Sequence, residues 1–445
     1  MSIRVKYKVT KLIDIGSDDK TFGFTHEIFR ENPKILVRRL TVGDRIFETT
    51  LQSCAEQSSP EDDWWLQVIR GELPVLRRAD TDVRRLRIAD LFCGSGGFTN
   101  GVRMAANAFG LKIDVKFAVD TDVAALGVYQ LNHKPRRTVG RSVKDILDSQ
   151  VIIKDGVAKF YYDPVLVHDD LEDFAGDIDL VVAGPPCQGH SNLNNHTRRD
   201  DVRNALYPTA AEIAVAVGAR GILIENVPAV LHDKYESVRI TRELLDALDW
   251  SIDDAVVSAT SVGWPQTRKR HFLSASAVGQ VVPLCLVVEA LKSEPRKLSW
   301  LLQDILDVDS PSFMDQGGKM SAVNVERIDY LFDNDVYTLP DHIRPKSHQD
   351  GNTYPSSYGR MRWDKPSGTI TTGFMTPGRG RFVHPLRRRP ITPREAARIQ
   401  GFPDSFKFGT NETPPSRSLL AKWIGDAVPG PLGYAAAMSV IPTLI

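Results

Sequence analysis

The chain has 445 residues, 42% of them hydrophobic and 25% charged, a composition typical of a folded protein and not of a largely disordered one. Lys plus Arg and Asp plus Glu both number 56, so the formal net charge is zero, and this balance by itself argues against a polyanionic partner. No apolar run is long enough to span a bilayer. Cys54, Cys93, Cys187 and Cys285 are too far apart for a disulfide framework or a CxxC metal site. These features predict a cytoplasmic protein with reduced thiols, without a metal and without membrane contact.

The first 86 residues carry no motif with recognisable chemistry. They contain two segments rich in β-forming residues, Ile3–Val9 and Ile35–Phe47, separated by polar stretches. We predict a small accessory module here, and contact with a partner or with DNA is the alternative.

From Arg87 onward, short apolar segments alternate with helix-length amphipathic ones, for example a helix ending near Phe109 and another over Val123–Leu131. This alternation predicts an α/β fold with a doubly wound, mostly parallel, Rossmann-like sheet and helices on both faces. Ligands of such sheets bind at the carboxyl ends of the strands, so the informative residues should follow each strand. The predicted strands are residues 87–92, 115–120, 178–184, 221–227 and 253–260.

A glycine-rich turn follows the first strand, in DLFCGSGGFTNG (90–101). Gly94, Gly96 and Gly97 permit a tight turn into a helix N-terminus, and Asp120 ends the next strand, where a carboxylate can bind a ribose diol. The pattern is GxGG without a following phosphate-binding Lys, which favours a nucleoside cofactor such as S-adenosylmethionine over NAD or ATP. An ordinary tight connection is the alternative.

Candidate catalytic side chains follow the next strands. Cys187 lies in GPPCQGHS (184–191), where two prolines stiffen the backbone before a thiol that is suited to act as a nucleophile. We read Cys54, Cys93 and Cys285 as small buried hydrophobes.

Glu225 follows three aliphatic residues, so desolvation should raise its pKa and allow it to hold a proton, unless it caps a helix or forms a salt bridge. In WPQTRKRHF (264–272), Arg268 and Arg270 would lie on one face of a strand. Arg268 could stabilise an oxygen or a phosphate, although a solvated charged strand is the default interpretation.

Together these motifs resemble the ordered motif series of the DNA cytosine-5 methyltransferases. The series is DLFCGSGGFTNG, GPPCQGHS, ENV, QTRKR, REAARIQGFPDSF (394–406) and IGDAVPGPL (424–432). The resemblance covers about Arg87–Phe272 and Arg387–Ala437. It implies an S-adenosylmethionine-dependent methyltransferase domain that acts on a cytosine flipped out of duplex DNA.

The resemblance also implies a role for each matching residue. Cys187 would attack C6 of cytosine, Glu225 would protonate or hydrogen-bond N3, Asn226 would hold the geometry of the adduct, and Arg268 would contact the base carbonyl. The cofactor would be held by Phe92, Gly94, Ser95, Gly96, Gly97, Asp120, Asp170, Leu171, Pro186, Asp426 and Ala427.

DNA recognition would fall between the QTRKR and REAARI motifs, roughly residues 274–386. Between Arg360 and Arg398 we count ten basic and two acidic residues, a local charge of 10 − 2 = +8, which is typical of a phosphate-binding surface. An ordinary cluster of β-turns is the alternative for any single residue there. The expected DNA-binding residues are Gln188, Ser191, Arg270, Arg360, Arg362, Thr371, Thr372, Arg379 and Arg381.

Three positions depart from the family pattern: His190 stands where Phe is usual, and Asp426 and Gly430 stand where Asn and Pro are usual. Asp426 adds a negative charge near a cationic sulfonium, but none of the three replaces a predicted catalytic residue, so we expect an active enzyme.

The predicted organisation is an accessory module (1–86), the first part of the catalytic domain (87–273), an irregular target-recognition domain (274–417) and a return to the catalytic domain (418–445). The expected partners are duplex DNA and a cognate restriction endonuclease or phage-defence partner, unless the enzyme is solitary, and the expected state is a monomer. Two alternatives stay open: methylation of tRNA, whose enzymes typically carry a CFT tripeptide that this chain lacks, and a catalytically inactive DNA-binding regulator.

Overall fold

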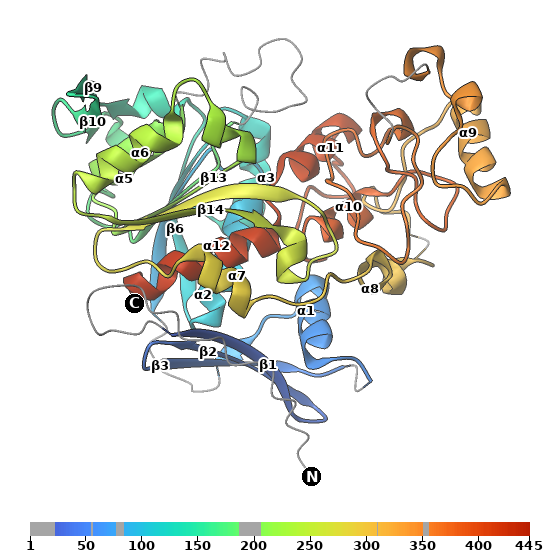
Figure 1. Cartoon of the computed structure of the whole chain (residues 1–445), viewed down its shortest axis with the longest axis horizontal. Helices are drawn as coiled ribbons and strands as arrows, with labels where there is room; N and C mark the ends of the chain where they lie inside the picture. The colour runs from blue at the N-terminus through green and yellow to red at the C-terminus, as the bar shows by residue number, and fades with distance from the viewer. Residues whose placement is uncertain (1–22, 55–56, 77–83, 187–205, 309, 350–355) are drawn as a thin grey trace. The chain divides into compact units, whose positions relative to one another are not determined.

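The computed structural model describes residues 23–54, 57–76, 84–186, 206–308, 310–349 and 356–445 (Figure 1). Its contacts divide the chain into two compact units. Unit 1 comprises the described residues of Met1–Ser258, Lys269–Lys292 and Val428–Ile445, and unit 2 those of Ala259–Arg268 and Ser293–Ala427.

These boundaries differ from the four predicted stretches. The N-terminal module is part of unit 1, and unit 2 begins at Ser293 and ends at Ala427 instead of spanning 274–417. The short segment Ala259–Arg268 also belongs to unit 2, because its backbone bonds there: Thr267 N donates to Ser367 O at 2.9 Å.

Unit 1 is built on a seven-stranded mixed sheet with the strand order β14-β15-β13-β12-β5-β6-β7. Neighbouring strands from β7 to β13 are parallel, whereas β15 is antiparallel to both β13 and β14. The predicted α/β fold is confirmed. The strands are β5 (Arg85–Leu91), β6 (Lys112–Val119), β7 (Arg137–Val139), β12 (Leu180–Ala183), β13 (Gly221–Asn226), β14 (Ser251–Ser258) and β15 (Lys269–Ser276).

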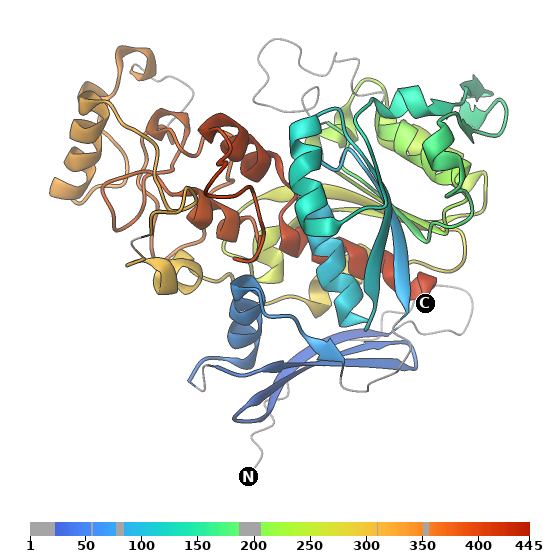
Figure 2. The same ribbon diagram turned by 180° about the vertical axis from the view of Figure 1, so that it is seen from behind.

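Helices cover both faces of this sheet (Figures 1 and 2). Helices α5 (Leu206–Ala216) and α6 (Ser237–Asp246) lie on one face, and α2 (Gly97–Ala108) and α3 (Val123–His133) lie on the other. The central strands β12 and β13 are buried throughout their length, as expected for parallel strands covered on both sides.

Helix α12 (Gly430–Leu444) packs closely against α2. A Cβ on Gly101 of α2 would lie 2.6 Å from the main-chain oxygen of Gly430 and 2.8 Å from the Cα of Gly433. The last helix of the chain therefore approaches the helix that follows the glycine-rich turn through a contact that only glycine permits.

The N-terminal module consists of the antiparallel strands β1 (Phe24–Asn32), β2 (Ile35–Val42), β3 (Arg45–Gln52) and β4 (Val75–Leu76) and of helix α1 (Pro60–Arg70). The predicted segment Ile35–Phe47 is thus two strands, since Gly43 turns the chain at φ +59°. Ile3–Val9 lies outside the described residues.

A buried arginine ties this module to the rest of unit 1. Arg38, 2% exposed, lies 4.8 Å from the centroid of the Trp64 ring and donates to Asn107 Oδ1 of α2 at 3.3 Å. Burial lowers the pKa of Arg38 from its usual value. The module is therefore integrated into unit 1 by packing, as a structural accessory would be.

The other elements of unit 1 are short. They are β8 (Leu147–Asp148), β9 (Val151–Lys154), β10 (Val157–Phe160), β11 (Val165–Leu166), α4 (Asp169–Glu172), α7 (Leu284–Ala290) and the 3₁₀ helices η1 (Val143–Ile146) and η3 (Pro228–His232).

Unit 2 is irregular, as predicted, with few regular elements around a small core. Buried Arg398 of α10 is one of its ties, since it donates to Asp404 Oδ1 at 2.8 Å and also bonds Asp304. The predicted helix Trp300–Leu306 appears as α8 and η5. The helices are α8 (Leu298–Leu302), α9 (Ala322–Asp333), α10 (Pro393–Ile399), α11 (Arg417–Asp426), η4 (Ala259–Val262), η5 (Gln303–Ile305), η6 (Asp341–Ile343), η7 (Lys346–His348) and η8 (Pro377–Arg379).

Among the described residues, no helix is both long enough and apolar enough to cross a membrane.

Candidate functional site

The glycine-rich turn connects β5 to α2 and is held by Asp120 at the end of β6. The Asp120 carboxylate accepts hydrogen bonds from the backbone N–H of Gly94 and of Asp122, both at 2.8 Å. Phe92 has φ +56°, a left-handed conformation that a bulky side chain adopts only where the surroundings impose it. A Cβ on Gly94 would meet no atom of the described residues within 4 Å, so that part of the chain leaves open space at the turn.

A histidine supports the same turn from behind. Arg103 Nη2 donates to His133 Nδ1 at 2.8 Å, which leaves the proton on Nε2, and Nε2 donates to the Gly96 carbonyl at 3.0 Å. Burial, and then the charge of Arg103, lower the pKa of His133 well below its usual value, so the ring is neutral. A Cβ on Gly96 would lie 2.3 Å from His133 Nε2. Neither His133 nor Arg103 was predicted, because nothing in the sequence pattern links them to the turn.

Asp90 lies buried below the turn, at the end of β5. Thr99 donates to its Oδ2, whereas its Oδ1 is buried and has no hydrogen-bond partner among the described residues. Burial raises the pKa of Asp90 to about 7 in spite of this bond. Burial, followed by the charges of Asp90 and Asp120, raises the pKa of the Cys93 thiol well above its usual value. Cys93 is therefore a buried, protonated thiol, as predicted.

The other two described cysteines differ from the prediction. Cys54 and Cys285 are both exposed and free. Cys54 follows the end of β3, and Cys285 is in α7, a helix with its buried face formed by Leu284, Leu286 and Val287. The expectation that both are buried is wrong, because residue type alone does not indicate which face of an element a residue occupies.

The carboxyl ends of β5, β12 and β13 meet at one point. A Cβ on Gly184, after β12, would lie 3.8 Å from the main-chain oxygen of Phe92 and 4.0 Å from Glu225 Oε2. Asn226 Nδ2 donates to Pro185 O at 3.4 Å, in the turn that leads towards Cys187. The turn, the Pro-Pro segment and Glu225 thus form one site, as the sheet pattern predicts. Cys187, Gln188, His190 and Ser191 lie outside the described residues.

Arg270 forms an ion pair with Glu225. Its Nε lies 2.7 Å from Glu225 Oε1, and both side chains are largely buried. Glu225 is opposite Phe272 in the β13–β15 register, so Arg270, two residues away on β15, is its diagonal neighbour on the same face. The pair is the salt bridge that the sequence left open as the alternative role of Glu225. The register of β13 and β15 places Arg270 beside Glu225, but the sequence does not show where β15 begins, so this pair was not predicted.

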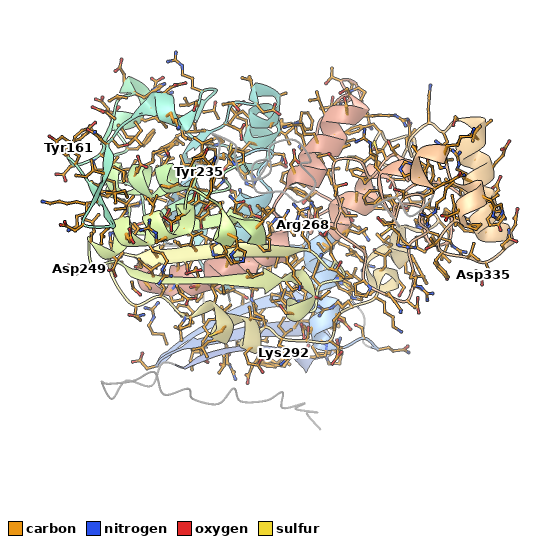
Figure 3. All side chains as sticks on the ribbon, turned by 45° about the horizontal axis from the view of Figure 1, so that its top comes forward. Tyr161, Tyr235, Asp249, Arg268, Lys292 and Asp335 are labelled. Atoms are coloured by element: carbon orange, nitrogen blue, oxygen red, sulfur yellow. The ribbon has the colours of Figure 1, made fainter. Side chains whose placement is uncertain are left out.

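Arg268 lies elsewhere, in unit 2 (labelled in Figure 3). The strand begins at Lys269, so the prediction that Arg268 and Arg270 share one face of a strand is wrong. Arg268 is 3% exposed, and its Nη1 donates to Ile370 O at 2.8 Å and to Gly425 O at 3.1 Å. A Cβ on Gly425 would lie 2.4 Å from Thr372 N. Arg268 therefore ties the threonine loop to α11.

The remaining predicted cofactor residues are distributed over both units. Ser95 and Gly97 belong to the turn, Pro186 to the Pro-Pro segment, and Asp170 is exposed on α4. Leu171 is 0% exposed and packs in the main core, so it presents no free face to a ligand. Asp426 and Ala427 are in unit 2, where Asp426 Oδ2 lies 3.9 Å from Lys422 Nζ.

The basic segment 360–398 is less positive in the structure than in the sequence. Six of its ten basic side chains form ion pairs with carboxylates, and five of those six use acids from outside the segment. The six are Arg360, Arg387, Arg388, Arg389, Arg394 and Arg398. The local sum of +8 therefore overstates the free positive charge.

The predicted DNA-binding residues of unit 2 differ in their surroundings. Arg360 is 8% exposed and pairs with Asp335 at 3.2 Å. Because its side chain is buried and already paired, we do not expect Arg360 to contact DNA directly. Arg362, Thr372 and Arg379 are exposed, and Thr371 and Arg381 are half-buried.

The fold defines the class of protein. The chain is similar to the solved S. pombe Dnmt2 methyltransferase, with 16% identity, a TM-score of 0.51 and coverage of 81% of this chain and 99% of that one. It is equally similar to the Entamoeba histolytica methyltransferase EhMeth, with 16% identity, a TM-score of 0.51 and coverage of 81% and 98%. The fold is that of a methyltransferase.

Sequence comparison identifies the family. The model of the C-5 cytosine-specific DNA methylases matches residues 86–441, and the chain belongs to this family. It is 37% identical over 381 residues to the Type II methyltransferase M1.BsuMI of Bacillus subtilis (strain 168), covering 85% of this chain and 84% of that protein. It is 28% identical over 363 residues to the Type II methylase M.HgiDII of Herpetosiphon aurantiacus, covering 79% and 94%.

Proposed function

We propose that this enzyme transfers a methyl group from S-adenosylmethionine to C5 of a cytosine that is flipped out of a specific duplex DNA sequence, within a type II restriction–modification system. The observation that carries the proposal is the meeting of the glycine-rich turn, the Pro-Pro segment before Cys187 and the Glu225–Arg270 pair at one edge of the sheet. The names of the Type II relatives support the biological setting.

The residues around the turn fit S-adenosylmethionine, which supplies an activated methyl group on a sulfonium. Asp120 accepts hydrogen bonds from two backbone N–H groups, and a carboxylate, which has about four lone-pair sites, can also accept from ribose hydroxyls. Among the described residues Gly94 leaves open space at the turn, and the turn is not followed by a phosphate-binding Lys. The exposed carboxylate of Asp170 is suited to accept from an adenine amino group. For Asp426 and Ala427, which belong to unit 2, the cofactor role is proposed from the family resemblance alone.

The base chemistry needs a nucleophile and a stabilising acid, because C5 of cytosine is a poor nucleophile. The Cys187 thiolate adds to C6, and the electron pair of the C5–C6 bond becomes available at C5. C5 then takes the methyl group, which leaves its sulfonium donor as a neutral thioether. Water takes up the C5 proton, and β-elimination breaks the C6–S bond, restores the C5–C6 double bond and releases the Cys187 thiolate. Glu225, whose Oε1 lies 2.7 Å from Arg270 Nε, delivers a proton to N3 or hydrogen-bonds it as the adduct forms, which stabilises the negative charge that addition of the thiolate places on the ring; a proton delivered in this way returns to Glu225 when the adduct breaks down.

We transfer the contact with the base carbonyl from Arg268 to Arg270. Arg270 already lies beside the acid that would bind the base. Among the described residues its Nε and Nη1 are engaged by Glu225 and by Lys269 O, so Nη2 is the group that we propose as donor to the base. Arg268 is instead a positioning residue for the loop that contains Thr371 and Thr372. We keep Thr371, Thr372, Arg362, Arg379 and Arg381 as candidate DNA contacts.

Bisulfite sequencing of DNA from cells that express the protein tests the reaction and identifies the target sequence. We expect fully methylated cytosines in one sequence context, and none in cells that express Cys187→Ala. Purified protein should form a covalent complex with a duplex that contains 5-fluorocytosine, whose fluorine cannot leave as a proton. Methyl incorporation into tRNA but not DNA, or full activity of Cys187→Ala, would contradict the proposal.

Two matched arginine variants test the reassignment. Arg270→Gln should lower the turnover number by roughly 10²-fold or more while the dissociation constant of S-adenosylmethionine is unchanged. Arg268→Gln should mainly lower thermal stability, because it removes bonds to two main-chain carbonyls inside unit 2. The assignment fails if Arg268→Gln is as stable as the wild type and has the larger loss of turnover.

A further inference from the structure

A second diagonal pair lies on β15, one residue from Arg270 and on the opposite face of the sheet. His271 Nε2 lies 3.0 Å from Asp254 Oδ2. His271 is opposite Val256 in the β14–β15 register, so Asp254, two residues away on β14, is its diagonal neighbour on the same face. The His271 side chain is 0% exposed and that of Asp254 is 20% exposed. β15 therefore forms a side-chain pair with each of its two neighbouring strands, since Arg270 pairs with Glu225 of β13.

Asp254 is the charged member of this pair. The hydrogen bond from His271 lowers the pKa of Asp254 from its usual value, although burial opposes this effect. Arg242 of α6 also donates to Asp254. Because the Asp254 carboxylate only accepts, the proton of the shared hydrogen bond belongs to His271 Nε2, which fixes the orientation of the imidazole ring.

Tyr207 of α5 lies at the other nitrogen of the ring. Its hydroxyl oxygen is 3.5 Å from His271 Nδ1, and the two ring centroids are 6.4 Å apart. Tyr207 is 1% exposed, and burial, followed by the charges of Asp254 and Glu225, raises its pKa well above the usual value. The hydroxyl therefore keeps its proton. We call Tyr207, Asp254 and His271 the histidine cluster.

The histidine cluster joins three elements that surround the catalytic edge of the sheet. Helices α5 and α6 pack side by side (Figure 1), and Tyr207 and Arg242 connect them to His271 and Asp254. Any displacement of β15 at His271 therefore has to break contacts with α5 and β14.

His271 also borders the candidate site directly. It is opposite Asn226 in the β13–β15 register, and Asn226 Nδ2 donates to Pro185 O. The preceding residue, Arg270, holds Glu225 at 2.7 Å. A shift of the backbone at His271 would therefore move Arg270 relative to both Glu225 and Asn226.

We infer that His271, held by Asp254 and Tyr207, is a positioning residue for methyl transfer, which keeps Arg270 in place beside Glu225 and the cytosine ring. The inference rests on the proposed function, in which Arg270 contacts the base. His271 follows the QTRKR motif and is not part of it. Such a residue affects the rate because misplacement of a catalytic group by about 1 Å can lower a rate on the order of 10²-fold.

Replacement of the imidazole tests the inference in the full-length enzyme. His271→Leu should lower the turnover number on a target duplex by roughly 10- to 100-fold, whereas the dissociation constants of S-adenosylmethionine and of the duplex stay at their wild-type values. His271→Gln, whose amide can still donate to Asp254, should recover most of the lost turnover. Tyr207→Phe removes only the hydroxyl and should cause a smaller loss of turnover.

Ser274→Ala is the matched control, because Ser274 is a buried polar residue further along the same strand. Ser274 is 0% exposed, and its Oγ lies 2.8 Å from Ser439 Oγ. Ser274→Ala should lower the melting temperature, since it breaks a buried hydrogen bond, but its turnover number should match that of the wild type.

A double variant separates positioning from general stability. If His271 acts through Arg270, adding His271→Leu to Arg270→Gln should reduce the turnover number no further than Arg270→Gln does alone. If the two losses multiply, if folded His271→Leu turns over like the wild type, or if Ser274→Ala loses as much turnover, the inference is wrong. Should His271→Leu fail to fold, Tyr207→Phe takes its place in the same comparison with Arg270→Gln. These outcomes leave the proposed function intact as long as the wild type methylates C5 of cytosine in duplex DNA, whereas absence of that reaction contradicts the proposed function itself.

Discussion

Two glycines of the same turn should respond differently to alanine. Gly94 and Gly96 both have positive φ, +51° and +95°, so a Cβ costs each about 1–2 kcal/mol of backbone strain. A Cβ on Gly94 meets no atom of the described residues within 4 Å, but on Gly96 it lies 2.3 Å from His133 Nε2. The His133 ring would have to move and would lose its bonds to Gly96 O and Arg103.

Each buried polar group that loses its partner costs about 1–3 kcal/mol. Gly96→Ala should therefore lower the free energy of unfolding by about 3–5 kcal/mol, and Gly94→Ala by only about 1–2 kcal/mol. Urea unfolding followed by circular dichroism measures both. Gly94→Ala should instead reduce the affinity for S-adenosylmethionine by calorimetry, since its Cβ enters the open space at the turn.

The double variant isolates the cause. With His133→Ala in place the clash disappears, so adding Gly96→Ala should cost only the strain, and the two changes should couple by about 2 kcal/mol. The reasoning is refuted if Gly96→Ala costs no more than Gly94→Ala, or if its cost is the same with and without His133.

Three other changes test the packing and the electrostatics of the fold. Asp90→Asn should flatten the pH dependence of stability: a carboxyl with a pKa of about 7 when folded and 3.8 as its reference loses roughly 4 kcal/mol of stabilisation as pH rises from 4 to 7. Urea unfolding at pH 5 and pH 8 should show wild type falling relative to the variant, and equal slopes would contradict this. Gly101→Ala should lower the melting temperature, since overpacking costs about 1–3 kcal/mol and its Cβ would lie 2.6 Å from a main-chain oxygen of α12; an unchanged melting temperature would show that the helices can separate freely. Arg398→Met should lower the free energy of unfolding of unit 2 by about 2 kcal/mol, less than for a fully buried ion pair because the two aspartate partners are partly exposed. Limited proteolysis should cleave Arg398→Met faster than Arg362→Gln, which should resist cleavage as well as the wild type does.

The sheet and the glycine-rich turn could be predicted from the sequence. Alternating strands and helices indicate a parallel sheet, and polar residues that directly follow such strands lie at its ligand-binding edge. Asp120 and Glu225 were found in this way. The Arg270–Glu225 pair was not predicted, because the sequence does not show at which residue the strand begins, and therefore not which arginine is the neighbour of Glu225. Periodicity does not locate a strand end to within one residue.

The summed charge of residues 360–398 was a poorer predictor of the structure than the pattern of strands and helices. The ten basic residues of 360–398 suggested a uniform basic surface, yet Arg387, Arg388 and Arg394 pair with acids 55 to 80 positions earlier in the chain. Such pairing depends on how loops without secondary-structure periodicity fold back, so a sum over neighbouring residues cannot detect it. His133 was missed for the same reason, since it meets Gly96 from 37 positions away.

The short segment Ala259–Arg268 has a consequence for recombining such enzymes. Unit 2 is drawn from two separate stretches of the chain, and Arg268 from the short one bonds Ile370 and Gly425 in the long one. A chimaera that exchanges only 293–427 would pair a foreign loop with a resident arginine. Exchange of unit 2 between relatives therefore requires that both segments, residues 259–268 and 293–427, be replaced together.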